Sequence, residues 1–560
     1  MADLNLLEPY ALGRKRVRGR FVIPSGIRCT HASTIQKCFD EIPPVGVVTT
    51  KSISFAPRAG YAEPIYVRYG PGCYANAVGL ANPGAEAFLK ELETIEIPAD
   101  KFLLVSIFGS DLESFLAAAR VLAPVADGFE LNFSCPHAAG YGAELGQELE
   151  LVRAITRAVV AETGLPVLVK LSPMLAALAR TAEAAIEAGA AGLTLINTAG
   201  PGLVAVEEHP VLSNRVGGLS GDAIRPLGLR AVELVRKAVG PDPVIIGMGG
   251  IAAPEHVRQY AQAGANLFGV GSALTGLDSR RMRDFFIALE RDTVAGVGRT
   301  GYERSCDSAA PMDYFPTRIV QRIDYDESLF KLILEDLPGE LRPGSMAGKF
   351  FFIWLPGVGE KPFAIFSVAE KSIVVRVVGN FTRRLSTLES GAKLYLRGPY
   401  GQGVPDPGPG ALVHVGGGTG IASLFEIGEH FRGRLQFFLL GARTRTHLFD
   451  LDKFKGLGTV LTATDDGSAG RHGPVIELVE QAALEAGEHP IFINCGPAPM
   501  VERAFEIERR FSPPDRIIGS IEYLTSCGVG ICGKCATPSG MLSCIDGPFL
   551  RWEEFQARRR

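Results

Sequence analysis

The sequence predicts a multidomain α/β protein whose first half is a (β/α)8 barrel, and three patterns along the chain support this prediction. Eight short apolar runs alternate with helical segments over the first 305 residues, Pro/Gly-punctuated β runs follow up to residue 408, and an α/β alternation then returns. Four closely spaced cysteines mark the last segment. We therefore expect a TIM barrel at 1–305, a small antiparallel β-barrel at 306–408, an α/β domain at 409–513 and a cysteine-rich domain at 514–560.

The composition agrees with several globular domains. The chain has 560 residues, 66 of them glycine, and its 57 Lys+Arg against 61 Asp+Glu give a formal charge of -4. Binding to a phosphate backbone needs a clear cationic excess, so we expect no nucleic-acid partner. The basic residues at 14–20 are interpreted as a solvated arm or a subunit contact, with a nucleic-acid or membrane patch as the alternative. The sequence has no signal-peptide core and no uncharged apolar run of about 18 residues, so we expect a soluble, cytoplasmic protein without a membrane partner.

The predicted barrel strands share a β-rich, apolar composition and are bounded by turn residues. They are RFVIPSG from Arg20, VGVVTTKS from Val45, FLLVSIFG from Phe102, GFELNFSC from Gly128, PVLVKLS from Pro166, GLTLINT from Gly192, PVIIGMGG from Pro243 and LFGVGSAL from Leu267. Between them, stretches such as DLESFLAAARVL and LGLRAVELVRKAV repeat apolar residues at spacings of three and four, as helices do.

Polar residues end several of these strands. They are Lys51-Ser52, Asn132-Phe133-Ser134-Cys135, Lys170 and Asn197-Thr198. A lone lysine at a strand end is usually solvated and a lone cysteine is usually a small core residue. Because the strand ends of a barrel meet on one face, the set as a whole predicts an active site. Gly249-Gly250 and Gly271-Ser272 end the last two strands and suit a phosphate, with simple turn formation as the alternative.

The second half contains a β region and a nucleotide-binding pattern. The runs RIVQRID, KLILEDL, KFFFIWLP, FAIFSVA, SIVVRVVG and KLYLRGPYG predict a small antiparallel barrel. After PDPGPG at 405–410, ALVHVGGGTGIA predicts a buried strand that leads through glycines into a helix, which points backbone amides at a pyrophosphate. Together with NCGPAPM at 494–500, another strand that ends in a tight turn, this pattern predicts dinucleotide binding.

The last 34 residues contain the motif Cys527-x4-Cys532-x2-Cys535-x8-Cys544. This is the plant-type spacing of a [2Fe-2S] cluster, and glycines between the cysteines let the backbone curl so that amides face the sulfurs. Zinc is the alternative, although zinc sites favour paired C-x2-C arms.

Motifs of the first half resemble the FMN barrel of class 1 dihydroorotate dehydrogenases. They are TKS at 50–52, NAVGLANPG at 76–84, LNFSCP at 131–136, INT at 196–198, GGLSGDAIRP at 217–226 and GMGGI at 247–251. The resemblance implies that FMN contacts Ser25, Gly26, Lys51, Ser52, Asn132, Lys170, Gly221, Gly249, Gly250, Gly271 and Ser272, with Lys170 beside the pyrimidine edge of the flavin. It implies that a planar pyrimidine-like substrate contacts Lys51, Asn76, Gly79, Leu80, Asn132, His137, Asn197 and Thr198.

The resemblance also implies that Cys135 and Lys51 are catalytic. Oxidising a dihydropyrimidine removes a hydride from one ring carbon and a proton from its neighbour, so a base must lie on the side of the substrate opposite the flavin. A thiol with an ordinary pKa near 8.5 can be that base if its surroundings favour the thiolate. The stretch HAAGYGAELGQ after Cys135 is a lid or an ordinary flexible loop.

One residue departs from the class 1 pattern. The family usually continues its cysteine motif as CPN, whereas this chain has CPH with His137. The CPH form followed by a glycine-rich loop is similar to the flavin barrel of dihydropyrimidine dehydrogenases, which act on uracil and thymine. A protonated histidine can still attract a carboxylate, and NAVGLANPG favours the dihydroorotate side.

The second half resembles the ferredoxin-reductase-like electron-transfer subunit of NAD-linked dihydroorotate dehydrogenases. The shared motifs are KPFAIFS, VGNFT, LRGPYGQG, GGGTGIA, TDDGSAGRHGPV, CGPAPM and the cysteine tail. The resemblance implies FAD at Lys361, Pro362, Phe363 and Thr382, NAD(H) at Gly416, Gly417, Gly418, Gly420, Cys495 and Gly496, and a cluster on the four cysteines of the tail. The family's Arg-Pro-x-Ser is Lys361-Pro362-Phe363-Ala364 here, which removes a bidentate fork and a hydroxyl, and its Gly-x-Gly-Thr is Gly379-Asn380-Phe381-Thr382.

These implications combine into one activity. Nicotinamide cofactors exchange two electrons and an iron–sulfur cluster carries one, so a flavin must stand on each side of the cluster. We expect a single-chain enzyme of pyrimidine biosynthesis that oxidises dihydroorotate with NAD+, in the order FMN, [2Fe-2S], FAD, NAD. The alternatives are an NAD(P)H-dependent reductase of another pyrimidine or unsaturated ring, and an electron-transfer flavoprotein with a non-catalytic barrel. A homodimer through the barrel is implied by the resemblance only.

The Cys135→Ser variant separates these alternatives. If Cys135 is the base, the substitution abolishes substrate turnover, while NADH-driven reduction of an artificial dye stays at the parent level because that activity uses only the second half. Both activities are measured on the same preparation. A parallel fall of the two would contradict this division of labour.

Overall fold

The computed structural model describes residues 5–134, 147–298 and 311–556. Two compact units make up the chain. The first comprises Met1–Ala310 with Val529–Ala536, and the second comprises Pro311–Gly528 with Thr537–Arg560.

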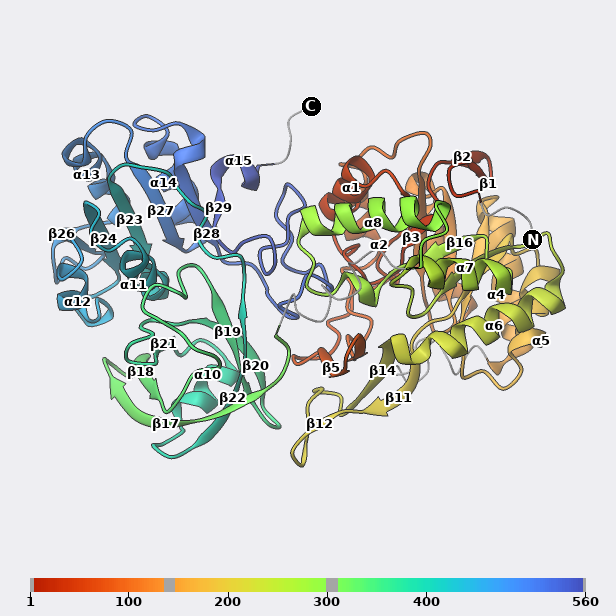
Figure 1. Ribbon diagram of the computed structural model, residues 1–560, viewed down its shortest axis with the longest axis horizontal. Coiled ribbons are helices and arrows are strands. Elements are labelled where there is room, and N and C mark those ends of the chain that lie inside the picture. The colour runs from red at the N-terminus through yellow and green to blue at the C-terminus, as the bar shows by residue number, and fades with distance from the viewer. Residues whose placement is uncertain (1–4, 135–146, 299–310, 557–560) are drawn as a thin grey trace. The chain divides into compact units, whose positions relative to one another are not determined.

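The first unit contains the predicted closed barrel of eight parallel strands (Figure 1). In chain order the strands are β3 (Phe21–Ile23), β4 (Val45–Thr49), β7 (Phe102–Ile107), β8 (Gly128–Asn132), β9 (Val167–Leu171), β10 (Gly192–Leu195), β15 (Val244–Met248) and β16 (Leu267–Gly269). Each strand lies within one of the eight apolar runs, and almost every strand residue is buried on both faces, as an all-parallel sheet requires.

Helices follow the barrel strands in the alternating pattern that the sequence predicts. They are α1 (Ala32–Glu41), α2 (Ala85–Leu92), α3 (Leu112–Leu122), α4 (Leu149–Thr163), α5 (Leu178–Glu187), α6 (Arg225–Val239), α7 (Pro254–Ala263) and α8 (Ser279–Val294). Local chemistry sets their ends. The Asp111 side chain accepts from the Ser114 amide and closes a capping box before α3, and Gly164 ends α4 in the left-handed conformation.

A four-stranded antiparallel sheet is inserted into the connections between barrel strands. It is built from β5 (Tyr66–Gly70), β6 (Cys73–Asn76), β11 (Ala199–Leu203) and β14 (Val216–Gly221) in the order β11-β14-β6-β5. In this sheet Asn76 pairs with Gly218, and Cys73 pairs with Gly221. Asn76, implied in substrate binding, and Gly221, implied in FMN binding, thus belong to one sheet although they lie about 145 positions apart in the sequence. The short hairpins β1 (Tyr10–Leu12) with β2 (Lys15–Val17) and β12 (Ala205–Val206) with β13 (His209–Pro210) complete the strands of this unit.

The second unit begins with a six-stranded antiparallel sheet in the order β20-β19-β22-β17-β18-β21. The strands are β17 (Phe315–Asp324), β18 (Leu329–Leu334), β19 (Phe350–Leu355), β20 (Gly359–Ala364), β21 (Ser372–Arg376) and β22 (Lys393–Tyr400), and the short helix α10 (Asn380–Ser386) follows β21. The antiparallel pairing agrees with the prediction, and β20 and β21 are the two end strands of the ladder. The run FAIFSVA is strand only at its start, because β20 ends at Ala364.

A seven-stranded sheet follows, in the order β26-β25-β24-β23-β27-β28-β29. Its strands are β23 (Leu412–Gly417), β24 (Gln436–Ala442), β25 (Thr459–Thr464), β26 (Arg471–His472), β27 (Ile491–Gly496), β28 (Ile517–Ile521) and the antiparallel β29 (Leu550–Arg551). The helices are α11 (Ile421–His430), α12 (Leu451–Lys455), α13 (Val479–Ala486), α14 (Ala498–Glu508) and α15 (Trp552–Phe555). From β23 the chain runs outward through β24 and β25 and then returns to the other side of β23 as β27. The carboxyl ends of β23 and β27 therefore form a topological switch point, where open α/β sheets bind their ligands.

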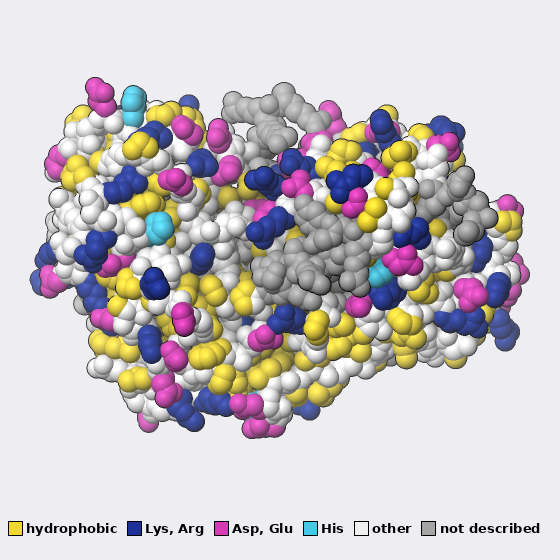
Figure 2. Space-filling view, viewed as in Figure 1, with side chains coloured by type: hydrophobic (Ala, Val, Ile, Leu, Met, Phe, Trp, Pro, Cys, Tyr) yellow, Lys and Arg dark blue, Asp and Glu magenta, His cyan; other side chains and the backbone are white. Residues whose placement is uncertain are grey.

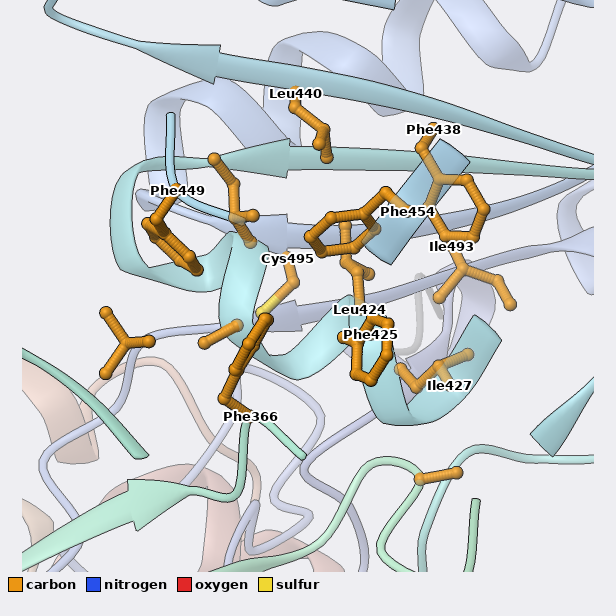
Figure 3. Packing of buried hydrophobic residues seen from close by; sticks show 14 of the residues in the cluster. Phe366, Leu424, Phe425, Ile427, Phe438, Leu440, Phe449, Phe454, Ile493 and Cys495 are labelled. Carbon is orange, nitrogen blue, oxygen red and sulfur yellow. The ribbon is translucent and has the colours of Figure 1, made fainter. Parts of the chain in front are cut away.

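A dense aromatic core lies between this parallel sheet and the helices α11 and α12 (Figure 3). Phe454 of α12 is fully buried, and its ring centroid lies 5.5 Å from that of Phe425 and 5.3 Å from that of Phe438. Rings from two helices and one strand therefore interlock, so this cluster holds α11 and α12 against the sheet that carries the switch point.

We predict that Phe454→Ala lowers the free energy of unfolding by about 3–5 kcal/mol, because it removes buried apolar area and leaves a cavity. Leu484→Ala is the matched control, since Leu484 of α13 is 70% exposed and its loss is expected to stay within about 0.5 kcal/mol. Denaturant unfolding followed by circular dichroism compares the two. Equal losses in both variants would contradict the assigned core.

Candidate functional site

The carboxyl ends of β8 and β9 place two of the predicted polar residues side by side. Asn132 pairs with Lys170 in the parallel ladder, and their exposed fractions are 5% and 3%. Lys51 and Ser52 directly follow β4, and Asn197 and Thr198 follow β10. Since the strands are parallel, all of these side chains belong to the same end of the barrel, where barrel enzymes carry their active sites.

A chain of hydroxyl groups connects four neighbouring barrel strands, β3, β4, β7 and β8. Ser25 Oγ lies 3.0 Å from Ser52 Oγ, which lies 2.9 Å from Ser106 Oγ, and Ser106 donates to Glu130 Oε1 at 3.0 Å. Each hydroxyl has one hydrogen. Because Ser106 spends its hydrogen on Glu130, Ser52 must donate to Ser106 and Ser25 must donate to Ser52. The lone pairs of Ser25 therefore stay available at the half-buried end of the chain, where they can accept from an N–H of a ligand.

The sequence patterns did not single out Glu130, the buried carboxylate at the inner end of this series of hydroxyl groups. Glu130 is fully buried, its Oε1 lies 3.8 Å from Lys170 Nζ, and its Oε2 has no hydrogen-bond partner among the described residues. An acidic residue inside the apolar strand GFELN was the one sign that could have revealed it. The pair brings a cation to the strand ends at the cost of burying two charges, which is typical of a functional site.

A second polar group orders the side chains that follow β8 and β10. Ser134 donates from its amide and its hydroxyl to Asn132 Oδ1, at 3.2 and 2.9 Å, while Asn132 Nδ2 donates to Ser52 at 3.0 Å. Asn197 Nδ2 donates to Ser134 Oγ at 2.8 Å, and the Thr198 amide donates to Asn197 Oδ1 at 2.9 Å. Three residues predicted to contact substrate thus form one network, with both amide side chains held in a single orientation.

The glycines predicted to hold a phosphate allow close backbone packing. Gly249 and Gly250 have φ of 121° and 73°, values that favour glycine. A Cβ on Gly250 would lie 2.7 Å from the carbonyl oxygen of Gly221, and a Cβ on Gly221 would meet that of Gly72. The backbone after β15 therefore carries no side chain at these two positions and packs directly against the backbone of Gly221. Gly271 and Ser272 follow β16, where Ser272 opens a short 3-10 helix. These residues fit the phosphate group of a flavin nucleotide.

The remaining predicted barrel residues have mixed placements. A Cβ on Gly26 would lie 4.0 Å from Lys51 Nζ, so these two predicted residues are neighbours. Gly79 and Leu80 lie in the loop after β6, both with positive φ. Cys135 and His137, the predicted base and the departing histidine, lie outside the described residues.

Cys29 is fully buried, and its carbonyl accepts a hydrogen bond from the Lys51 amide at 3.0 Å. Burial raises the pKa of the Cys29 thiol to about 11, so it is protonated at neutral pH. Its sulfur accepts from the Gly26 amide at 3.0 Å. We assign Cys29 a structural part in shaping the turn that carries Ser25 and Gly26.

In the second unit, the residues implied for FAD lie on β20 and α10. Lys361, Pro362 and Phe363 belong to β20, and the Phe363 ring centroid lies 6.2 Å from that of Phe381 at the start of α10. Thr382 Oγ1 accepts from the amides of Val378 and Gly379 at 2.9 and 3.1 Å. The hydroxyl of Thr382 thus orders the turn before α10, and the pair of rings Phe363 and Phe381 brings the two implied FAD segments together.

A cavity of about 280 Å³ opens at the switch point of the parallel sheet. Its lining includes Gly417, Gly418 and Thr419 after β23, Gly441, Ala442 and Arg443 after β24, Asp465 after β25, Pro497 and Met500 after β27, and Leu329 and Arg376 of the antiparallel sheet. Of the residues implied for NAD, Gly417 and Gly418 line this cavity. A Cβ on Gly418 would meet nothing within 4 Å, and its φ of 55° favours glycine.

The other residues implied for NAD do not line this cavity, and close contacts among them bring the ends of β23 and β27 together. They are Gly416, Gly420, Cys495 and Gly496. A Cβ on Gly420 would lie 2.3 Å from the Cys495 carbonyl oxygen and 2.8 Å from the Gly496 amide nitrogen. Burial raises the pKa of the Cys495 thiol to about 11, and the side chain packs in the aromatic core of Figure 3. These residues therefore determine how closely the two strand ends approach.

The four cysteines of the tail are buried, with exposed fractions of 1% for Cys527, 9% for Cys532, 2% for Cys535 and 1% for Cys544. Gly528, Gly530 and Gly533 all have φ between 70° and 78°, so this backbone course requires glycine. Inside the first unit, Thr30 Oγ1 donates to the Cys532 carbonyl at 2.6 Å. Buried thiols on a glycine-rich loop fit an iron–sulfur cluster. Among the described residues no three His, Cys, Asp or Glu side chains are arranged to hold a metal ion, so coordination by the four sulfurs stays a prediction.

The surface agrees with a near-neutral protein. On the face in Figure 2, Lys/Arg and Asp/Glu side chains are interspersed. No helix within the described ranges has both the length and the apolar character needed to cross a membrane.

Comparison with protein families identifies both ends of the chain. Residues 12–284 match the family described as Dihydroorotate dehydrogenase, and residues 522–556 match the iron-sulfur cluster binding domain of dihydroorotate dehydrogenase B.

Relatives named "Dihydroorotate dehydrogenase B (NAD(+)), catalytic subunit" match the first half. The Methanopyrus kandleri protein is 41% identical over 313 residues, which are 54% of this chain and 96% of that protein. The Pyrococcus horikoshii protein is 39% identical over 264 residues, or 46% of this chain and 84% of that protein.

A solved chain described under "Insights into flavin-based electron bifurcation via the NADH-dependent reduced ferredoxin-NADP oxidoreductase structure" is 29% identical, covers 43% of this chain and 91% of its own, and has a TM-score of 0.38. That score is too low to support a functional argument. The barrel, its polar strand ends and the two family matches together show that the chain belongs to the dihydroorotate dehydrogenase B family of flavin- and iron–sulfur-dependent oxidoreductases.

Proposed function

We propose that this chain couples the oxidation of dihydroorotate to the reduction of NAD+ within one polypeptide. One observation carries the proposal: a barrel that matches the catalytic subunit of NAD-linked relatives over 96% of one relative's length continues in the same chain into a sheet with a cavity at its nucleotide-binding switch point. The relatives named above match only about half of this chain, so the remainder is available for the transfer of electrons to a nicotinamide cofactor.

In the barrel, the described residues bind and orient the substrate and the flavin. Asn132, Ser134 and Asn197 form the network that holds two amides in one orientation, as recognition of a planar ring with alternating donors and acceptors requires. Lys51 and Lys170 supply positive charge at the same strand ends. FMN bound at these strand ends would supply the acceptor for the hydride that leaves the substrate. Cys135 removes the accompanying proton in this proposal.

In the second unit, we assign FAD to the β20 and α10 segments and NAD(H) to the cavity at β23 and β27. Lys361 attracts a diphosphate through its charge, without the fork that an arginine provides. The four cysteines of the tail would hold a cluster that supplies one-electron transfer. The proposed order puts a flavin on each side of it, because a flavin can exchange both single electrons and the electron pair that the nicotinamide needs.

The test is anaerobic bleaching of the flavin absorbance with dihydroorotate, dihydrouracil and dihydrothymine in parallel. We expect dihydroorotate to bleach the flavins and to yield NADH when NAD+ is added, while the two uncharged dihydropyrimidines leave the spectrum unchanged. Reduction by NADH is the internal control for an intact second half. Silence with dihydroorotate in a sample that NADH does bleach would contradict the proposed substrate but not the nicotinamide assignment.

The close approach of β23 and β27 yields a separate prediction. In Gly420→Ala the new methyl group would overlap the Cys495 carbonyl, so the strand ends must separate and the cavity must deform. We expect the affinity for NADH to fall at least tenfold, by titration of flavin reduction, while bleaching by dihydroorotate stays at the parent level.

Gly298→Ala is the matched control, because Gly298, like Gly420, does not have a positive φ, and its Cβ would meet nothing within 4 Å. It should keep the parent affinity for NADH. A Gly420→Ala enzyme with unchanged affinity would show that the switch point does not hold the nicotinamide cofactor.

A further inference from the structure

A fully buried ion pair in the second unit lies against the first cysteine of the cluster motif. Arg397 of β22 and Glu360 of β20 have exposed fractions of 1% each. Arg397 Nε donates to Glu360 Oε1 at 2.6 Å and Nη2 donates to Oε2 at 2.7 Å, which is the bidentate fork that only arginine can make. Neither residue belongs to the sites described above.

The third nitrogen of the Arg397 guanidinium, Nη1, has further hydrogen-bond partners. Nη1 donates to the Tyr400 hydroxyl at 2.8 Å and to the Cys527 carbonyl oxygen at 3.0 Å. The carbon atom Cζ lies 4.2 Å from the centre of the Phe352 ring, within the range of a cation–π interaction. The buried charge is thus satisfied by a carboxylate, a hydroxyl, a ring and the backbone of the cluster motif.

The same pair also orders the first residues of the second unit. Tyr314 donates to Glu360 Oε1 at 3.0 Å, and Tyr400 donates to the Pro311 carbonyl at 2.5 Å. Three segments far apart in the sequence therefore share one polar network: residues 311–314, the strands β20 and β22, and the chain at Cys527. Burying two charges is unfavourable, so removing one partner of such a pair leaves an uncompensated buried charge and is strongly destabilising.

A second observation points to the cluster loop. Gly528 has φ of 78°, and a Cβ there would lie 2.7 Å from Cε2 of Phe352, the ring beneath the guanidinium. The backbone at Gly528 is therefore packed against the Phe352 ring, and the neighbouring Cys527 carbonyl accepts a hydrogen bond from the guanidinium. Such contacts leave the Cys527 backbone little freedom.

We propose that Arg397, held by Glu360, is a positioning residue for the iron–sulfur cluster: it fixes the Cys527 carbonyl and so the direction in which the first thiolate ligand leaves the backbone. This inference rests on the iron–sulfur part of the proposed function. The Glu360 carboxylate has a second effect, because it offsets the cationic charge beside a group that gains negative charge on reduction.

The test compares the purified holoenzyme with its Arg397→Lys variant, which keeps the charge but loses the fork. We expect unchanged flavin content, a changed electron paramagnetic resonance spectrum of the dithionite-reduced cluster, and bleaching of the cluster by a chelator at least ten times faster than in the parent. Arg318→Lys is the matched control in the same antiparallel sheet: Arg318 donates to the Gly391 carbonyl at 2.8 Å, and none of its described contacts reaches the cysteine motif. It should behave as the parent does.

Glu360→Gln is the second variant, and it tests the positioning role of the ion pair even if Arg397→Lys misfolds and loses its flavins. It keeps the shape and leaves the guanidinium charge uncompensated, so reduction of the cluster becomes easier. We expect the one-electron equilibrium to shift about tenfold, or about 59 mV upward in a redox titration. Parent spectra, lifetimes and potentials in both variants would overturn the positioning role. A parent protein that binds no iron after reconstitution would instead overturn the cluster assignment itself, and the positioning role with it.

Discussion

Lys170 lies opposite Asn132 in the ladder between β8 and β9, and Cys495 lies opposite Gly416 in the ladder between β23 and β27. Both pairs follow from parallel strand pairing, which gathers all carboxyl ends at one edge. In the barrel the edge is closed into a ring, so residues from five strands form one continuous polar chain. In the open sheet the strand order reverses at β23, so the connections on its two sides run in opposite directions and a cavity forms at this edge. The two candidate sites therefore depend on the same constraint, applied to a closed and to an open sheet.

Each of the two units contains a buried ion pair. Glu130 with Lys170 in the barrel and Glu360 with Arg397 in the antiparallel sheet are both almost inaccessible to solvent. Apolar residues of similar volume would serve stability as well or better. The first pair is loose, at 3.8 Å, and leaves a carboxylate oxygen without a partner in the described chain, whereas the second is a bidentate fork with every oxygen engaged. The loose pair suits a place where a ligand arrives, and the tight pair suits a fixed support.

In the proposed function, the chain joins two kinds of chemistry that differ in the number of electrons moved. A barrel of the dihydroorotate dehydrogenase family acts on a carbon–carbon bond, and the second unit carries a nucleotide-type sheet and a cysteine motif matched to an iron–sulfur domain. Covalent fusion keeps the two at a high effective concentration, which removes the need for a tight interface between separate subunits. The glycines that are abundant in the sequence serve both halves, since they occur where backbone must approach backbone, as at Gly250 and Gly420.

The sequence by itself determined the eight barrel strands, the glycine turn at Gly417 and Gly418 and the spacing of the four cysteines, because each depends on residues close together in the chain. It also placed Asn132, Lys170 and Asn197 at strand ends, since strand periodicity is local. It did not reveal Ser106, Glu130, Glu360 or Arg397. Their partners lie on other strands, 24 positions away for Ser106 and Glu130 and 37 for Glu360 and Arg397, and only the register of the folded sheets decides which of them meet. The tertiary structure alone decided that Arg397 reaches Cys527, 130 residues later, because a hydrogen bond over that distance follows from packing and not from any pattern in the sequence.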